Sequence, residues 1–254
     1  MKPQVQVFED VEELSRAAAE FVTRRAVEVC RAGGAFRVAL SGGSTPKKLY
    51  QLLAGEPWRG SFPWEKSHFF LGDERFVAQE HPESNFGMAR QALLDKVPLP
   101  AGNVHPLDSA AVSVEEAARR YEEELRKVFE RGGKDRGSKP AGDFPRFDLV
   151  LLGLGPDGHT ASLFPGNPVL EERRRWAAAV EAPPGYPTRE RVSLTLPVIN
   201  AAAYVLFLAA GREKSPIVKA ILETPEKARS LYPAALVEPS AGELFWFLDR
   251  QARI

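Results

Sequence analysis

An acid and a histidine share a glycine-rich turn in the segment Gly153-Leu154-Gly155-Pro156-Asp157-Gly158-His159-Thr160, directly after an apolar run. A histidine in such a turn can act as a general base near neutral pH, and a carboxylate close by can fix its tautomer. His159 and Asp157 are therefore candidate catalytic residues. The alternative is a turn aspartate beside a surface histidine.

A second glycine-rich turn carries hydroxyl groups and precedes a helix pattern, in Leu40-Ser41-Gly42-Gly43-Ser44-Thr45-Pro46. Glycines let the backbone approach a ligand closely, and the first N–H groups of a helix attract anions. Ser41, Gly42, Gly43 and Ser44 are therefore candidate phosphate-binding residues, although the Gly-Lys-Ser/Thr of a Walker A loop is missing. The alternative is a plain turn with Ser and Thr caps and a proline in the first helical turn.

Charged residues stand at or near further strand ends. In Leu71-Gly72-Asp73-Glu74-Arg75 the planar guanidinium of Arg75 can fork onto a phosphate, and Asp73 can position a hydroxyl or a basic side chain. A solvated turn is the alternative for this segment. Arg191 opens a later strand pattern and Lys214 follows another, which makes both of them candidate cations, although each alone is more often a solvated charge.

Three other kinds of site are not favoured. Residues 153–158 formally match G-x-G-x-x-G, but Pro156 removes an amide that a pyrophosphate needs, and no acid ends the next strand as the dinucleotide fingerprint expects. No Gly-x-Ser-x-Gly elbow of a serine hydrolase occurs. The spacing of the histidines resembles no metal site, so we expect neither a metal nor a cofactor. We interpret His68, His81 and His105 as structural or incidental.

Composition narrows the broad class. The chain has 34 Lys and Arg against 34 Asp and Glu, so its net charge gives no reason to expect a nucleic-acid or membrane partner. A single cysteine excludes an intrachain disulfide. We find no signal-peptide pattern and no run near the roughly 20 apolar residues of a membrane span. These features predict a cytoplasmic protein.

Strand and helix patterns alternate along the chain. We predict strands at 5–8, 36–40, 68–71, 147–152, 177–180, 191–194, 204–209 and 245–248, and helices at 10–32, 45–53, 85–94, 113–131 and 213–222. Residues 131–145, rich in Gly, Pro and charge, predict a surface loop. The alternation predicts one Rossmann-like α/β domain over residues 1–254, with a mostly parallel sheet and helices on both faces. Ligands bind such folds beyond the carboxyl ends of the strands, where the candidate residues lie.

Four motifs in this order resemble those of the 6-phosphogluconolactonases, and the resemblance covers nearly the whole chain. They are Ala39 to Pro46, Asp73-Glu74-Arg75 with Ser84-Asn85-Phe86, Gly153 to Pro165, and Gly211-Arg212-Glu213-Lys214. The resemblance implies the fold that this family shares with glucosamine-6-phosphate deaminases. The deaminases carry a Glu shortly after their Asp-Gly-His, whereas this chain has the apolar Phe164 there, which favours lactone hydrolysis.

The resemblance also implies a substrate and roles for residues. The expected reaction is hydrolysis of 6-phospho-D-glucono-1,5-lactone to 6-phosphogluconate in the oxidative pentose phosphate pathway, with His159 as the base that activates water. Asp157 would orient His159 or bind the sugar. The turn 41–44 would hold the phosphate together with Arg75, Arg191 and Lys214. We expect a monomer or small homo-oligomer whose partner is the small-molecule lactone, with no nucleic acid and no membrane. A sugar-phosphate sensor would need a DNA-binding segment, which we do not find.

Overall fold

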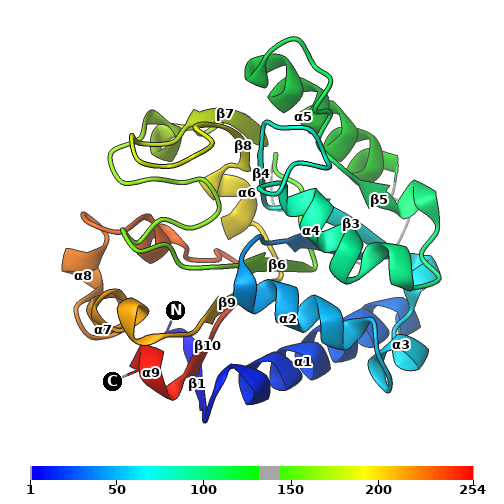
Figure 1. Ribbon diagram of the computed structural model, residues 1–254, viewed down its shortest axis with the longest axis horizontal. Coiled ribbons are helices and arrows are strands. Elements are labelled where there is room, and N and C mark those ends of the chain that lie inside the picture. Colours follow the sequence, from blue (N-terminus) through cyan, green and yellow to red (C-terminus); the bar gives the residue numbers. More distant parts are fainter. Residues whose placement is uncertain (1, 132–142, 254) are drawn as a thin grey trace.

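A seven-stranded sheet forms the centre of the computed structural model, which describes residues 2–131 and 143–253 (Figure 1). The strand order is β1-β10-β9-β6-β2-β3-β5, and every neighbouring pair is parallel. The strands of this sheet are β1 (Gln4–Phe8), β2 (Phe36–Leu40), β3 (Ser67–Leu71), β5 (Val104–His105), β6 (Leu149–Leu152), β9 (Tyr204–Ala209) and β10 (Glu243–Asp249).

A second, antiparallel sheet has the strand order β4-β8-β7. It consists of β4 (Asp73–Arg75), β7 (Ala177–Glu181) and β8 (Glu190–Leu194). Gly72 joins the two sheets, because its N–H donates to Leu40 in β2 and its carbonyl accepts from Leu194 in β8, both at 2.8 Å. The small sheet is therefore fixed beside the carboxyl ends of the central strands.

Helices cover both faces of the central sheet. Alternation along β9 shows the division, because Leu206 and Leu208 join the core under α1, α2 and α4, whereas Val205 and Phe207 join the core that includes α5, α6, α7 and the small sheet. Figure 1 shows α1 and α2 on one side of the sheet and α5 on the other. The helices are α1 (Val11–Arg31), α2 (Ser44–Leu53), α3 (Trp58–Ser61), α4 (Asn85–Ala92), α5 (Val114–Arg131), α6 (Leu196–Asn200), α7 (Ser215–Glu223), α8 (Pro225–Ala228) and α9 (Arg250–Arg253).

The chain changes direction across the sheet between β2 and β6. Among the strands of this sheet, β2 is followed along the chain by its neighbour β3 on one side, whereas β6 is followed by β9 on the other. Ligands of open α/β sheets bind at such a switch point, in the crevice beyond the strand ends. The turns that leave Leu40 and Leu152 meet there, since a Cβ on Gly153 would lie 3.7 Å from the Ser41 hydroxyl.

The predicted fold class is confirmed, and each predicted strand and helix is present with ends within two residues of the predicted ones. The prediction left out the short elements β4, β5, α3, α6, α8 and α9, and with β4 it missed the separate antiparallel sheet. Most of the loop predicted at 131–145 lies outside the described residues. Among the residues that the structure describes, no helix has the length and apolar character of a membrane span.

Candidate functional site

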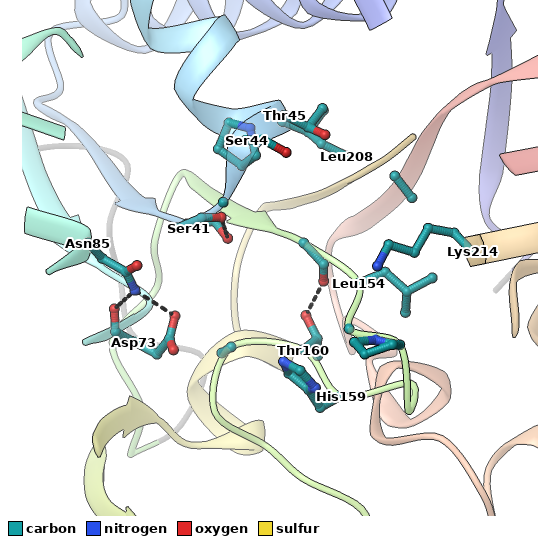
Figure 2. Close-up of a pocket in the computed structure, with 18 of the residues that line it drawn as sticks. Ser41, Ser44, Thr45, Asp73, Asn85, Leu154, His159, Thr160, Leu208 and Lys214 are labelled. Atoms are coloured by element: carbon teal, nitrogen blue, oxygen red, sulfur yellow. Dashed lines mark hydrogen bonds between the residues drawn. The ribbon is translucent and has the colours of Figure 1, made fainter. Parts of the chain in front are cut away.

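A cavity of about 340 Å³ opens at the switch point, beyond the carboxyl ends of β2, β6 and β9 (Figure 2). The residues around it come from segments far apart in the sequence. Of the predicted site residues, Asp157 does not line the cavity. The others do, and they are Ser41, Gly42, Gly43, Ser44, Asp73, Arg75, His159, Arg191 and Lys214. The sequence prediction of which residues gather here therefore agrees with the geometry.

The first turn of α2 forms one wall of the cavity. Gly43 is its N-cap residue, with φ +106°, and no described side chain caps the helix. In α1, by contrast, the Asp10 side chain accepts hydrogen bonds from two of the first N–H groups. The uncapped amides of α2 are therefore available to an anion in the cavity. Gly42 is required for packing, because a Cβ there would lie 2.0 Å from Asn85 Oδ1.

His159 lines the cavity, and Asp157 lies behind it. His159 Nδ1 is 2.5 Å from Asp157 Oδ1, and the backbone N–H of His159 donates to the same oxygen at 3.1 Å. The Tyr186 hydroxyl donates to Asp157 Oδ2 at 3.2 Å. This geometry agrees with the first of the two roles predicted for Asp157, orientation of the imidazole.

The protons of this cluster can be placed. Burial raises the pKa of Asp157, but the hydrogen bonds and charge of His159 outweigh burial and lower it to about 2. Burial, followed by the charge of Asp157, raises the pKa of Tyr186 to about 12. Asp157 is therefore a carboxylate that only accepts, so the proton between it and His159 belongs to Nδ1. When the ring carries a single proton, Nε2 is then its unprotonated nitrogen, and it has no hydrogen-bond partner within the described residues.

The backbone of the turn holds the imidazole in place. A Cβ on Gly155 would lie 2.1 Å from Cε1 of the His159 ring, so the ring rests directly against the backbone there. Gly158 has φ +79°, and Ala161 has φ +48°, a region that few non-glycine residues adopt. The turn is not followed directly by a helix, unlike a dinucleotide fingerprint.

Two arginines, Arg75 and Arg191, face the cavity. Arg75 and Arg191 are opposite each other in the antiparallel β4–β8 pair. Burial, followed by the charge of Arg75, lowers the pKa of Arg191, which is only 3% exposed. Among the described residues neither guanidinium forms an ion pair, and Nε of Arg75 is buried with no hydrogen-bond partner. Like charges opposite each other destabilise a strand pair, so an anionic ligand would stabilise this one.

Asp73 and Lys214 lie on opposite sides of the cavity (Figure 2). Asp73 is buried, and its Oδ2 accepts a hydrogen bond from the Ser162 hydroxyl at 2.7 Å. Asn85 donates to the carbonyl oxygen of Asp73 at 2.9 Å. Lys214 stands at the N-terminus of α7, with Nζ 3.8 Å from Glu213. Both charges are thus supported by neighbouring side chains.

Glu74 is buried and joins β4 to α4, whereas the sequence left a solvated turn open for this segment. Its carboxylate accepts the N–H groups of Arg75, Asn85 and Phe86 and the hydroxyl of Ser84, over 2.7 to 3.0 Å. Burial raises the pKa of Glu74, and these hydrogen bonds oppose the increase. The contacts fix β4, whose other two residues line the cavity.

Replacing Glu74 by alanine is expected to lower the free energy of unfolding by about 3 kcal/mol, because buried N–H groups would lose a shared acceptor. Urea denaturation followed by circular dichroism measures the change. Glu80→Ala, at an exposed position of the next segment, is the matched control. Equal and small effects of the two substitutions would contradict a structural role for Glu74.

Sequence reasoning missed Tyr186, Asn85 and Ser162 as site residues. Tyr186 lies in an irregular proline- and glycine-rich segment, where no periodicity indicates which side chain points inward. Asn85 was predicted as the start of a helix and stood in the motif Ser84-Asn85-Phe86, but it was given no role in the site. Ser162 follows the Asp-Gly-His motif closely, so a search of that segment for further polar residues would have found it.

The other histidines lie elsewhere. His105 Nδ1 is 3.0 Å from Glu124, and its Nε2 is 3.0 Å from His68, outside the cavity. His81 accepts the backbone N–H of Glu83. In the described ranges, no three His, Cys, Asp or Glu side chains are grouped so that they could hold a metal ion.

Known proteins with this sequence pattern are numerous. A family model described as glucosamine-6-phosphate isomerases/6-phosphogluconolactonase matches residues 9–246. A 6-phosphogluconolactonase of Synechocystis sp. is 45% identical over 99% of this chain and 98% of its own length. The 6-phosphogluconolactonase of Rattus norvegicus is 42% identical over 98% of this chain and 91% of its own. The solved 6-phosphogluconolactonase from Trypanosoma cruzi has a TM-score of 0.85 at 32% identity, covering 99% of this chain and 97% of that one. The resemblance predicted from the sequence is confirmed, and the chain belongs to the glucosamine-6-phosphate isomerase/6-phosphogluconolactonase family.

Proposed function

We propose that this protein is an enzyme that hydrolyses 6-phospho-D-glucono-1,5-lactone to 6-phosphogluconate, a step of the oxidative pentose phosphate pathway. The observation that carries the proposal is the pair of His159 and Asp157 at a cavity that also holds two arginines, neither of which forms an ion pair within the described residues. A base for water and a site for an anion are what hydrolysis of a phosphorylated lactone requires. The names of the relatives support this choice of substrate.

His159 carries the proton in this mechanism. Its Nε2 takes a proton from water as the water oxygen attacks C1 of the lactone, and the carbonyl becomes a tetrahedral oxyanion. When the oxyanion collapses, the bond between C1 and the ring oxygen breaks. The imidazolium returns the proton to that oxygen, which leaves a hydroxyl on the sugar chain and a carboxylic acid at C1. Asp157 holds the proton on Nδ1 and stabilises the imidazolium between the two steps.

The phosphate of the substrate is bound at a distance from the reacting carbon. Turn 41–44 offers the uncapped amides of α2, and the cations Arg75, Arg191 and Lys214 complete the anion site. Asp73 accepts a hydrogen bond from a hydroxyl group of the sugar. Anchoring the remote phosphate holds C1 close to the base, and this positioning lowers the activation free energy of the reaction.

The surroundings of His159 favour lactone hydrolysis over deamination. Phe164 occupies the place where the resemblance puts the acid of a deaminase, and it is fully buried. Its ring centroid lies 4.6 Å from that of His159. An apolar ring cannot exchange a proton with an opening sugar ring. The base therefore works here without a second acid at this position.

A coupled assay on freshly generated 6-phosphogluconolactone tests the proposal, with the spontaneous rate of hydrolysis subtracted. Saturable turnover above this background is expected, together with no release of ammonia from glucosamine 6-phosphate. Turnover of the amino sugar with no acceleration of lactone hydrolysis would reject the lactonase in favour of a deaminase.

Replacing Arg75 by alanine is expected to raise KM about 10- to 100-fold with little change in kcat, because the hydrogen bonds to phosphate act equally in ground and transition states. Steady-state kinetics measures both constants. Arg119→Ala is the control, since Arg119 is exposed on α5. A fall in kcat at unchanged KM would show that Arg75 acts on the reacting atoms instead.

A further inference from the structure

Tyr186 reaches the pair of His159 and Asp157 from the segment between β7 and β8, and it takes no part in the proton transfers of the proposed reaction. Its hydroxyl lies 3.2 Å from Asp157 Oδ2 and 3.2 Å from His159 Nδ1. It also lines the cavity. This hydroxyl is therefore within hydrogen-bond distance of both members of the pair.

The hydrogen bonds around Asp157 occupy both carboxylate oxygens. Oδ1 accepts Nδ1–H and the backbone N–H of His159, and Oδ2 accepts the Tyr186 hydroxyl. Because the pKa of Tyr186 is raised to about 12, the hydroxyl stays protonated at neutral pH and donates. Without it, Oδ2 would have no donor among the described side chains, and the carboxylate would be held on one side only.

The Tyr186 ring packs against the same group. It meets His159 edge-on at 5.6 Å and Phe164 at 5.0 Å, measured between ring centroids. The guanidinium carbon of Arg191 lies 5.3 Å from its ring centre. The ring therefore restricts rotation of the imidazole as well as contacting one of the two cavity arginines.

The segment that carries Tyr186 is held on both sides. The Thr188 hydroxyl donates to the carboxylate of Glu83, whose backbone carbonyl accepts from Arg75. Arg191 Nε donates to the Thr188 carbonyl at 3.1 Å. Tyr186 is thus tied to the same two strands that carry the arginines.

We propose that Tyr186 is a positioning residue for the lactonase reaction: its hydroxyl holds the second oxygen of Asp157, so that His159 keeps its proton on Nδ1 and presents Nε2 to the cavity. This inference rests on the proposed function. Tyr186 transfers no proton itself. It acts through Asp157, so its removal weakens the base without removing it.

Tyr186→Phe tests the hydroxyl alone, because the ring and its contacts remain. We expect kcat to fall about tenfold with KM nearly unchanged, the size of effect that loss of one hydrogen bond to a charged group produces. Tyr232→Phe is the matched control, since Tyr232 packs beside Gly158 and its hydroxyl has no hydrogen-bond partner in the described ranges. An unchanged kcat in Tyr186→Phe, or a rise in KM alone, would overturn the proposal.

The double variant Tyr186→Phe with Asp157→Asn shows whether Tyr186 acts through Asp157 or independently of it. If Tyr186 acts through Asp157, the tyrosine substitution should change kcat little when Asp157→Asn is already present, because the effects of residues acting as a unit are not additive. The full tenfold loss in both backgrounds would overturn the proposal.

The tautomer itself provides a readout that needs no substrate. In protein labelled with ¹⁵N-histidine, under conditions where the His159 ring is neutral, we expect the wild type to show a protonated Nδ1 and an unprotonated Nε2. In Tyr186→Phe the two ¹⁵N shifts should move toward each other, and identical spectra would contradict the proposal. Absence of lactone turnover in the wild type would instead reject the proposed function, so the two failures are distinguishable.

Discussion

Replacing His159 by alanine is expected to lower kcat about 10²- to 10⁴-fold, the range that a positioned general base contributes. The reason is geometric: within the described residues, no other imidazole lines the cavity. KM should change little, because the groups proposed to hold the phosphate stay in place. The coupled lactone assay, corrected for spontaneous hydrolysis, measures both constants.

Two comparisons make this result specific. His81→Ala removes an exposed histidine outside the cavity and should retain the wild-type kcat. Imidazole added to the buffer should restore part of the activity of His159→Ala, since the space left by the ring opens to the cavity. A His159→Ala protein with near-normal kcat would require another base and would remove the basis of the mechanism.

The central sheet and the turns that carry the base could be predicted from the sequence. β2 and β6 are short apolar runs that end abruptly in glycine, at Ser41-Gly42-Gly43 and at Gly153. Parallel strands of one sheet end at one edge, so the polar residues that follow them meet there. Local patterns and one rule of topology therefore predict this edge of the sheet as the place of a ligand, and the cavity lies there.

The partnership of Arg75 and Arg191 could not be predicted in this way. It depends on the pairing of β4 with β8, and β4 is only three residues long and carries three charged side chains. No apolar alternation marks such a strand. Its place is set instead by contacts distant in the sequence, through Gly72 to both sheets and through Glu74 to α4.

Tyr186 escaped prediction for a different reason. Its segment runs Ala182-Pro183-Pro184-Gly185-Tyr186-Pro187, which predicts a loop and says nothing about the direction of the tyrosine. Gly185 has φ +101°, and Arg189 Nε donates to the Ala182 carbonyl within the same loop. The contact of this loop with a distant part of the chain is the hydrogen bond from the Thr188 hydroxyl to Glu83. Side-chain positions in such a loop follow from tertiary contacts rather than from local sequence.

Replacing Asp157 by asparagine is expected to lower kcat about 10²- to 10³-fold while leaving KM nearly unchanged. In the wild type, two carboxylate oxygens accept three donors, the Nδ1–H and backbone N–H of His159 and the hydroxyl of Tyr186. Asparagine keeps one oxygen and introduces an NH₂ group among those donors. If that NH₂ group faces Nδ1, the ring proton moves to Nε2, and the base is lost; in either orientation the imidazolium loses its counter-charge.

Which of the two kinetic constants changes decides between the roles first predicted for Asp157. A residue that orients the base affects kcat, whereas one that binds a sugar hydroxyl equally in both states affects KM. Asp95→Asn is the control, because this substitution makes the same change of charge away from the cavity. Asp95 forms a surface ion pair with Arg90. Since Asp157 lies outside the cavity lining and contacts the base directly, a variant with raised KM and normal kcat would contradict the geometry on which the mechanism rests.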